Sequence, residues 1–317
     1  MPVSLRDAIS TGPLVVAPGA YDGLTARLVA RHGFPAVYMT GAGTSVSHGY
    51  PDYGLLTMTE MVENAARVTA AAGIPVIADA DTGYGNELNV VRTVRAYARA
   101  GVAAIHIEDQ TFPKRCGHLA GKEIIDRDAW LRKIRAAAES RPDPGLLIIA
   151  RTDARAVDGL DEALGRVNAA LAVGADVAFV EAPQTVEEIA AVPAAVSGPC
   201  LFNVVPGGKS PEVTVADLAR WGYRIAIFPS LLITPVVAAC EQALTALAHS
   251  GGVASATGTG AAAGLDGGPA ALFRRVGADE WDALRERYGA RGNSVGTTDV
   301  SAGEIGAPCG PHGSATD

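Results

Sequence analysis

Aromatic side chains are scarce in this chain of 317 residues, at 5% of the sequence, although hydrophobic residues as a whole make up 48%. The core must therefore be built from aliphatic side chains, chiefly those of Ala, Val, Leu and Ile. A stretch rich in Lys and Arg is also missing, and the net charge is −8. This balance excludes the basic surface with which proteins bind nucleic acids, and it argues against attraction to an anionic membrane.

Cysteine is equally sparse, because the chain has only Cys116, Cys200, Cys240 and Cys309, all far apart. Such spacing excludes a disulfide framework and a C-x-x-C zinc site, and it favours a reducing compartment. No apolar run reaches the ~18 residues of a membrane span, and the N-terminus does not resemble a signal peptide. We therefore expect a cytoplasmic protein with Cys200 and Cys240 as small buried side chains.

Short aliphatic runs alternate with segments of helical period through the first three-quarters of the chain. Each run is almost continuously apolar, which is typical of a strand buried on both faces. The runs cover residues 14–17, 36–39, 75–78, 103–107, 146–150, 177–180, 200–204 and 224–228. The helical segments cover residues 22–32, 59–72, 88–100, 127–140, 160–173, 186–196, 215–221 and 231–249.

Eight strands alternating with eight helices predict a parallel sheet, and eight is the number that closes a (β/α)₈ TIM-type barrel. A doubly wound open sheet is the alternative, but the turn after the first run lacks the G-x-G-x-x-G pattern of a dinucleotide site. We expect residues 1–250 to form the barrel, residues 251–288 to form a linker and a C-terminal helix, and residues 289–317 to form a flexible tail. The tail is rich in Gly, Ser, Thr and Pro.

Polar residues follow directly after the apolar runs, where the active site of such a barrel forms. Three carboxylates, Asp79, Asp81 and Glu108, come from two neighbouring strands. They would repel one another in a shared cleft unless a cation neutralised them. Hard oxygen ligands favour Mg²⁺, with Mn²⁺ as the alternative. Each acid taken singly could equally cap a helix or pair with an arginine.

The segment Lys114-Arg115-Cys116-Gly117-His118 follows the fourth run and should lie in a loop. It places a thiol between two cations and close to an imidazole. Neighbouring cations lower the pKa of a thiol, so we expect Cys116 to exchange protons near neutral pH.

These residues together resemble the isocitrate lyase/phosphoenolpyruvate mutase superfamily, over about residues 15–248. The most specific motifs are Asp79-Ala80-Asp81-Thr82-Gly83-Tyr84-Gly85 and Lys114-Arg115-Cys116-Gly117-His118. The motif at 114–118 is similar to the flexible active-site loop of the branch that contains 2-methylisocitrate lyase, dimethylmalate lyase and carboxyphosphonoenolpyruvate phosphonomutase.

The resemblance implies a role for each matching position. Asp79 would bind Mg²⁺ directly, and Asp81 and Glu108 would contact it through waters. Tyr38, Thr40, Gly41 and Ala42 match the segment that holds a 2-oxo acid, and Asp52 matches an aspartate near the metal. The remaining residues expected to act on the substrate and the loop are Lys114, Arg115, Cys116, Gly117, His118, Arg151, Glu181 and Asn203.

The implied chemistry is a retro-aldol cleavage of a 2-hydroxy di- or tricarboxylate to pyruvate or glyoxylate. Tyr38 would remove the hydroxyl proton, and Cys116 would protonate the enolate under a closed loop of residues 113–123. Lys114, His118 and Arg151 complete the expected catalytic set. The alternatives are a phosphonomutase, an oxaloacetate-type decarboxylase, and a barrel that only binds.

Some features depart from the family pattern. Pro206 stands where close relatives commonly have a glutamate, and His48 replaces a small or aliphatic residue. These changes lie around the substrate and predict an altered pocket for its second half. The resemblance also implies a homo-oligomer, a tetramer or a dimer, with a C-terminal helix exchanged between neighbours.

Overall fold

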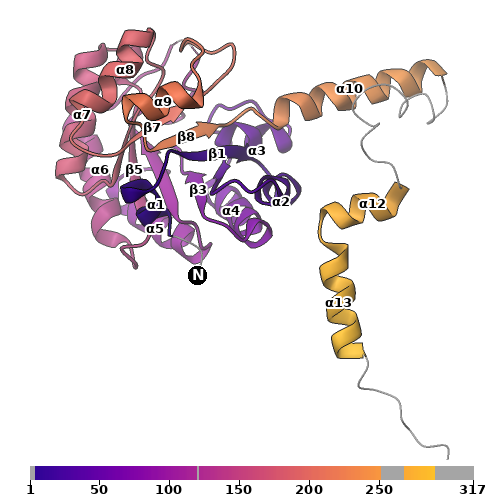
Figure 1. Ribbon diagram of the computed structural model, residues 1–317. Coiled ribbons are helices and arrows are strands. Elements are labelled where there is room, and N and C mark those ends of the chain that lie inside the picture. Colours follow the sequence, from indigo (N-terminus) through magenta and orange to yellow (C-terminus); the bar gives the residue numbers. More distant parts are fainter. Residues whose placement is uncertain (1–3, 120, 251–267, 290–317) are drawn as a thin grey trace, which may run out of the picture. The chain divides into compact units, whose positions relative to one another are not determined.

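The computed structural model describes residues 4–119, 121–250 and 268–289. Eight parallel strands form a closed barrel in which each strand pairs with the next and the last pairs with the first (Figure 1). The strands are β1 (Val15–Ala20), β2 (Val37–Met39), β3 (Val76–Asp79), β4 (Ala104–Glu108), β5 (Leu147–Thr152), β6 (Val177–Val180), β7 (Cys200–Asn203) and β8 (Ile225–Phe228). Closure confirms the predicted (β/α)₈ barrel and excludes the open sheet.

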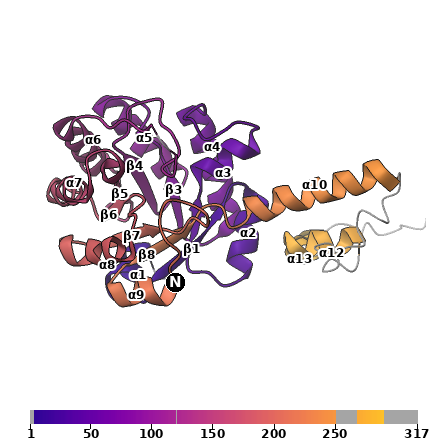
Figure 2. The same cartoon turned by 90° about the horizontal axis from the view of Figure 1, so that it is seen from above.

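Helices surround the barrel, as the view along it shows (Figure 2). In chain order they are α1 (Leu5–Thr11), α2 (Gly23–Arg31), α3 (Gly41–Ser47), α4 (Met58–Ala72), α5 (Glu87–Arg99), α6 (Arg127–Ser140), the short η1 (Ala154–Ala156), α7 (Leu160–Ala172), α8 (Val186–Ala195), α9 (Val215–Trp221) and α10 (Ile233–Ser250). The sequence did not predict α1, α3 or η1. Helix α3 is rich in Gly and Ser, which are weak helix formers, and it begins where the Thr40 hydroxyl accepts the N–H of Gly43.

Side chains alternate in direction along each strand, so every second residue faces the barrel interior. The interior cluster includes Ile77, Leu147, Ile149, Phe179 and Leu201. Leu5 and Ile9 of α1 belong to the same cluster as Val15, Val177 and Ile225, which are the first residues of their strands. Helix α1 therefore covers the end of the barrel at which the strands begin, and the opposite end is left for a site.

The chain divides into two compact units, residues 1–268 and 269–317. In the second unit the structure has two helices, α12 (Gly268–Arg275) and α13 (Ala278–Gly289), where the sequence is compatible with one helix or two. Residues 251–267 of the predicted linker and residues 290–317 of the predicted tail lie outside the described residues. No helix in the described ranges is long and apolar enough to cross a bilayer.

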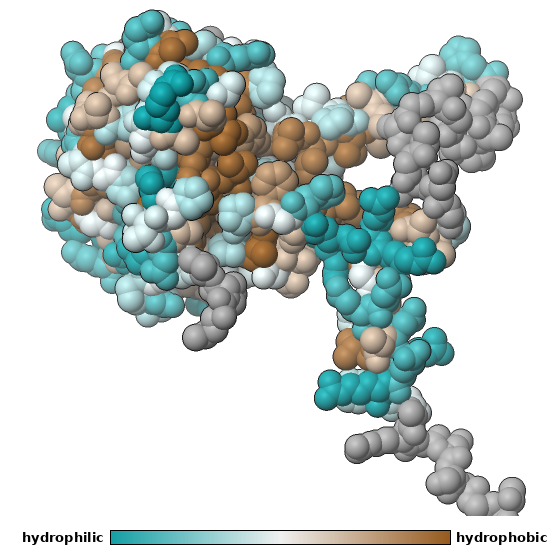
Figure 3. All heavy atoms as spheres, viewed as in Figure 1, coloured by the Kyte–Doolittle hydropathy of each residue, from teal (hydrophilic) through white to brown (hydrophobic). Residues whose placement is uncertain are grey.

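Helix α10 carries apolar side chains that this chain leaves exposed. Val236, Val237, Leu244 and Leu247 are all more than 40% exposed, and Figure 3 shows apolar residues on the surface of the first part of α10. Cys240 on the same helix is exposed as well, so the expectation that it is a buried side chain is wrong for this chain by itself. Cys200, in β7, is buried as expected.

Candidate active site

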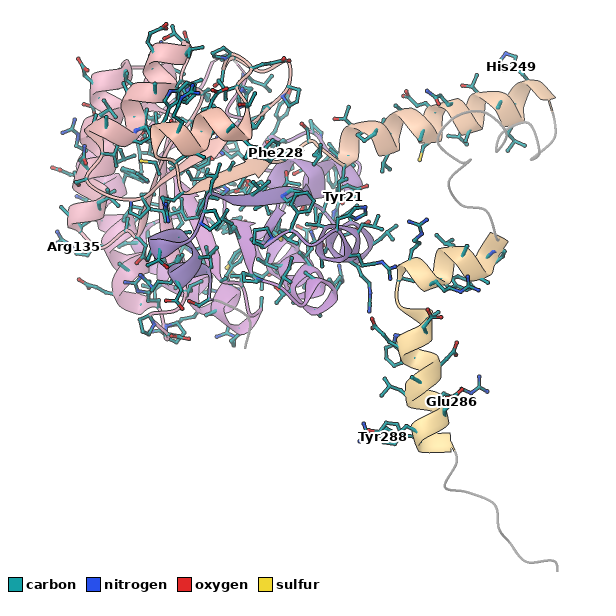
Figure 4. All side chains as sticks on the ribbon, in the orientation of Figure 1. Tyr21, Arg135, Phe228, His249, Glu286 and Tyr288 are labelled. Atoms are coloured by element: carbon teal, nitrogen blue, oxygen red, sulfur yellow. The ribbon has the colours of Figure 1, made fainter. Side chains whose placement is uncertain are left out.

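The inward-facing residues change character along each strand, from apolar where the strand begins to polar where it ends. The two-residue period leads from Ile77 to Asp79 in β3 and from Ile149 to Arg151 in β5. It leads equally from Ala104 through His106 to Glu108, from Phe179 to Glu181 and from Leu201 to Asn203. In Figure 4, Tyr21 and Phe228 mark this end of the adjacent strands β1 and β8.

A cavity of about 170 Å³ lies at this end of the barrel. Twelve of the sixteen site residues predicted from the sequence line it: Tyr38, Thr40, Ala42, Asp52, Asp79, Lys114, Cys116, Gly117, His118, Arg151, Glu181 and Asn203. The alternation within the strands and the loops that follow them thus bring together residues that span more than 160 positions of the sequence.

The Asp79 carboxylate is closely surrounded by Tyr38, Gly41 and the backbone of Asp81. Its Oδ1 accepts the backbone N–H of Asp81 at 2.9 Å, and its Oδ2 lies 3.4 Å from the hydroxyl of Tyr38. Gly41, a predicted substrate contact, packs directly against it, because a Cβ atom at position 41 would lie 2.3 Å from Oδ2 of Asp79. The close approach of α3 to β3 therefore requires glycine at this position.

The other two predicted metal ligands lie beside the cavity and face cations. Asp81 Oδ1 is 3.0 Å from Lys114 Nζ, and Glu108 Oε2 is 3.2 Å from Arg151 Nη1. Within the described ranges, no hydrogen bond satisfies Asp81 Oδ1 or either carboxylate oxygen of Glu108. Unsatisfied buried carboxylate oxygens are a donor set that suits a hard cation such as Mg²⁺.

The carboxylates do not converge closely enough to form a complete cage. In the described part of the chain, no group of three His, Cys, Asp or Glu side chains is close enough to hold an ion by itself. Mg²⁺ commonly keeps several waters and binds few carboxylates directly. The arrangement therefore fits an ion with one direct protein ligand and water-mediated contacts to the other acids.

Burial and mutual repulsion set the protonation of these acids. Burial raises the pKa of Glu108 well above its usual range, and it raises the pKa of Asp81 to about 6. Burial acts to raise the pKa of Asp79, but the interaction with His106 and the positive charges of Lys114 and Arg151 lower it overall. Asp79 is thus the carboxylate most readily ionised, as a direct metal ligand should be.

Lys114 places an ammonium among the acids. Its Nζ lies 2.5 Å from Asp52 and 3.0 Å from Asp81, and the side chain is buried. Burial opposes its charge, but Asp81 and Asp52 outweigh it and raise the pKa of Lys114 well above the usual range. Lys114 therefore stays positive and ties the loop to the acidic group.

Cys116 lies in the wall of the cavity, but its predicted acidity is wrong. Burial raises the pKa of the thiol, and the negative charge of Asp52 raises it further, against the weaker opposite effect of Lys114. The carboxylate partners of Lys114 offset its charge, so its stabilisation of a thiolate is too weak to outweigh burial and Asp52. Cys116 is therefore a neutral thiol, which is the form that can donate a proton.

His118 joins the loop to strand β6. Its Nδ1 accepts the backbone N–H of Lys209 at 3.0 Å, so a neutral ring carries its proton on Nε2, which lies 2.9 Å from Glu181 Oε1. Burial would raise the pKa of Glu181, but Arg151 and His118 hold it well below the usual range. Asn203 Nδ2 also approaches this carboxylate, at 3.2 Å.

Arg115 is the one predicted site residue that this structure places elsewhere. It is exposed and lines a different cavity with Gln110 and Lys122. Its backbone, in contrast, is fixed, because Gln110 exchanges two hydrogen bonds with the N–H and C=O of Arg115 at 3.0 and 2.8 Å. His48, which the sequence marked as unusual, is also exposed and follows the end of α3.

His106 is a site residue that the sequence analysis did not assign. It is fully buried, its Nε2 lies 2.9 Å from the Tyr38 hydroxyl, and its ring stacks on that of Tyr38. Burial lowers the pKa of His106 to about 4, so the ring is neutral. The alternation from Ala104 to Glu108 contained the signal, since it requires His106 to face the interior.

Part of the cavity lining is apolar. This apolar wall consists of Val46 of α3, Val205 after β7 and Ile233 of α10, together with Ala42 and Pro229. The same lining includes Lys114, His118 and Arg151, each of which already faces an acidic side chain. The cavity can therefore hold one end of a small acid among charges and the other against alkyl groups.

Comparisons with known proteins agree with this arrangement. A family model described as phosphoenolpyruvate phosphomutase matches residues 5–248. The chain is 50% identical over 244 residues to 2,3-dimethylmalate lyase of Eubacterium barkeri, covering 77% of this chain and 84% of that protein. It is 42% identical over 247 residues to 2-methylisocitrate lyase of Aeropyrum pernix, covering 78% and 80%.

Solved structures are similar over most of the chain. A complex of oxaloacetate acetylhydrolase with the inhibitor 3,3-difluorooxalacetate has a TM-score of 0.84 at 41% identity, and the match covers 92% of this chain and 97% of that one. A complex of phosphonopyruvate hydrolase with oxalate and Mg²⁺ has a TM-score of 0.79 at 31% identity and covers 90% and 97%.

Proposed function

Because this chain belongs to the isocitrate lyase/phosphoenolpyruvate mutase superfamily, we propose that it is a Mg²⁺-dependent lyase that cleaves a carbon–carbon bond of a 2-hydroxy dicarboxylate. The products would be a 2-oxo acid and a second carboxylic acid. The position of the Cys116 thiol in the wall of the cavity that also contains Asp79 and Arg151 carries the proposal. A cleavage that leaves an enolate requires a proton donor at that place.

Asp79, with Asp81 and Glu108 beside it, would hold the ion. When bound, Mg²⁺ supplies positive charge that stabilises the oxygen of the substrate's hydroxyl group as it loses its proton. The chain provides the rest of the machinery. Tyr38 can pass its phenolic proton to His106, because its hydroxyl lies 2.9 Å from Nε2 of that ring.

Cleavage would start when the substrate hydroxyl gives its proton to the Tyr38 oxygen as the phenolic proton passes to His106. The carbon–carbon bond then breaks, and its electron pair stays on the carbon next to the second carboxylate. Cys116 gives that carbon the proton of its thiol. After the products leave, His106 returns its proton to Tyr38 as the Tyr38 hydroxyl releases one to the solvent of the opened cavity, and the thiolate takes up a proton from that solvent. Protons and charges balance over the cycle, and no oxidant is needed.

The charged side of the cavity would position the two carboxylates. Arg151 and Lys114 carry the positive charges, and Asn203 adds an amide. Glu181 fixes His118, and with it the loop, from the opposite side. Loop residues that touch both the barrel and the substrate allow the site to exclude water while the enolate exists.

The apolar wall favours an alkyl-substituted dicarboxylate over a tricarboxylate. A third carboxylate would need a further positive partner, because Lys114 and Arg151 would already be engaged with the first two. Val46, Val205 and Ile233 instead offer contact to methyl or methylene groups, each worth about 0.8 kcal/mol when buried. The substituents on the carbon that becomes the enolate would therefore lie against these three residues.

A substrate screen tests this function. The protein with Mg²⁺ would be mixed in turn with 2,3-dimethylmalate, 2-methylisocitrate and isocitrate, and release of pyruvate or glyoxylate would be followed in a coupled assay. We expect the fastest release from the alkylated malate. If no 2-hydroxy acid is cleaved and no condensation of a 2-oxo acid with a second carboxylic acid is detected, the lyase is ruled out.

We also propose that the active form is a homo-oligomer in which α10 packs against a second copy. Val236 and Val237 of α10 are exposed, and packing against a second copy would bury their apolar side chains. Val236→Glu together with Val237→Glu should lower the mass measured by light scattering after size exclusion. An unchanged mass would refute a role of α10 in assembly.

A further inference from the structure

Lys122 is a buried lysine for which the proposed reaction has no task. Its side chain is 1% exposed, and it lies outside the lining of the substrate cavity. Its Nζ donates two short hydrogen bonds, both of 2.6 Å, one to the carbonyl of Gly117 and one to Oδ1 of Asp153. A single ammonium thus joins the loop to the barrel.

The acceptor on the barrel side is held rigidly. Asp153 follows β5, its backbone N–H donates to Asp109 Oδ1 at 2.8 Å, and its carboxylate accepts from Arg151 Nε at 3.0 Å. Burial acts to raise the pKa of Asp153, but Arg151 and Lys122 lower it overall. Asp153 is therefore ionised and gives Lys122 a fixed negative partner.

Lys122 itself stands at the base of the loop, where the chain rejoins the barrel. Thr111 N–H donates to the carbonyl of Glu123 at 2.8 Å, and Gln110 pairs with Ile124 in an isolated antiparallel bridge. These bonds close the loop at its base, next to position 122. The base and Asp153 are therefore anchored to the barrel by bonds that do not involve the tip of the loop.

The other acceptor, the carbonyl of Gly117, belongs to the tip of the loop. Gly117 lies between Cys116 and His118, and a Cβ atom there would lie 2.5 Å from both Arg151 Nη2 and Glu181 Oε1. When the tip lifts, the carbonyl of Gly117 leaves Lys122 and a buried ammonium loses one of its two acceptors. Unsatisfied buried charges are strongly unfavourable, so this bond biases the loop toward the closed position.

We propose that Lys122 is a positioning residue that holds the Cys116–His118 tip closed over the cavity. It acts through the carbonyl of Gly117 and touches neither substrate nor ion. The inference depends on the proposed function only in so far as Cys116 is the proton donor. The closed position itself can be measured without turnover.

The reactivity of the Cys116 thiol reports the position of the tip. Wild type, Lys122→Met and Lys122→Gln would be treated with iodoacetamide, with and without Mg²⁺ and oxalate. Mass spectrometry would follow the peptide that contains Cys116, and glutathione added at a known concentration would serve as the reference thiol in each reaction. Methionine has a similar length without donors, and glutamine keeps a donor without the charge.

Lys209→Met is the matched control. Lys209 also donates its Nζ to a carbonyl of the loop, that of Leu119 at 3.1 Å, but this bond is exposed. Exposed pairs contribute little, so in Lys209→Met the rate of alkylation of Cys116 should stay within about twofold of wild type. Loss of the two buried, charge-assisted bonds in Lys122→Met should speed alkylation of Cys116 by about tenfold to a hundredfold. The rate for Lys122→Gln should lie between those of wild type and Lys122→Met.

Turnover gives the second measurement. The kcat of Lys122→Met should fall at least as far as the alkylation rate rises, and Lys122→Arg, which keeps the charge, should recover part of both. A purely structural role would lower the melting temperature and leave the alkylation of Cys116, relative to the reference thiol, unchanged. Equal alkylation rates in wild type and Lys122→Met would overturn the proposal, and a wild-type protein that cleaves no hydroxy acid would overturn only the lyase function.

Discussion

Gly41→Ala should separate metal binding from folding, because one methyl group is directed at the carboxylate that we propose to hold Mg²⁺. The new Cβ would lie 2.3 Å from Asp79 Oδ2, whereas ordinary contact begins at 3.4 Å. The carboxylate or the start of α3 must therefore shift by about 1.1 Å, the difference between those two distances. A displacement of about 1 Å at reacting groups is enough to slow a reaction about a hundredfold.

Gly23→Ala is the matched control for this change. Gly23 is the first residue of α2, as Gly41 is of α3, and each follows a side chain that caps its helix. A Cβ atom at position 23 would meet only Ala71, at 3.4 Å. This variant should therefore keep its activity and be slightly more stable, by up to about 1 kcal/mol, because alanine restricts the unfolded chain.

Calorimetric titration with Mg²⁺ in the presence of oxalate would measure the effect. We expect the affinity of Gly41→Ala for Mg²⁺ to fall at least about tenfold, with circular dichroism close to that of wild type and a free energy of unfolding reduced by about 1–3 kcal/mol. An affinity equal to that of Gly23→Ala would show that Asp79 is not a ligand of the ion, and the proposed site would then be wrong.

Three further changes test other parts of the reasoning. Cys116→Ser should leave the fold intact and lower kcat by about a hundredfold or more in the coupled assay, whereas Cys200→Ser should keep full activity per folded molecule; full turnover by the first would refute proton donation. Val205→Arg should shift the ratio of kcat/KM from 2,3-dimethylmalate toward 2-methylisocitrate by about tenfold, and an unchanged ratio would contradict the apolar wall. Burial lowers the pKa of Lys133 to about 8 from 10.5, so its neutral form is favoured in the folded state and stability should rise with pH between those values, by up to about 3 kcal/mol. Lys133→Met should remove that rise in urea unfolding, and an identical pH dependence in both proteins would refute it.

The order of strands could be predicted because their signal is local. All eight predicted runs are strands, and those at 177–180 and 200–204 match their observed positions to within one residue. Strands buried on both faces must be apolar throughout, and turn residues mark their ends. Helix α3 was missed for the opposite reason, since its Gly- and Ser-rich sequence has little preference for a helix and is fixed by packing against Asp79.

Local patterns were less reliable where partners far along the chain compete. Thr185 and Glu188 predict a reciprocal capping box, and the Thr185 hydroxyl does accept the N–H of Glu188. The Glu188 carboxylate instead accepts from Arg155 and from the backbone N–H of Gln184. Arg155, 33 positions away, therefore binds the Glu188 carboxylate that would have completed the capping box. No local sequence pattern reveals this partner.

The chemistry of the site divides in the same way. The sequence by itself determined most of the side chains that collect at one end of the barrel, because the two-residue period of the strands and the positions of their ends can be read locally. Only the tertiary structure decided the charge states of these side chains and the hydrogen bonds that hold them in place. The pKa of the Cys116 thiol is raised and not lowered, since burial and Asp52 outweigh Lys114. The hydrogen bonds of Lys122 join positions 117, 122 and 153. Burial and distance in space control such interactions, and neither can be read from neighbours along the chain.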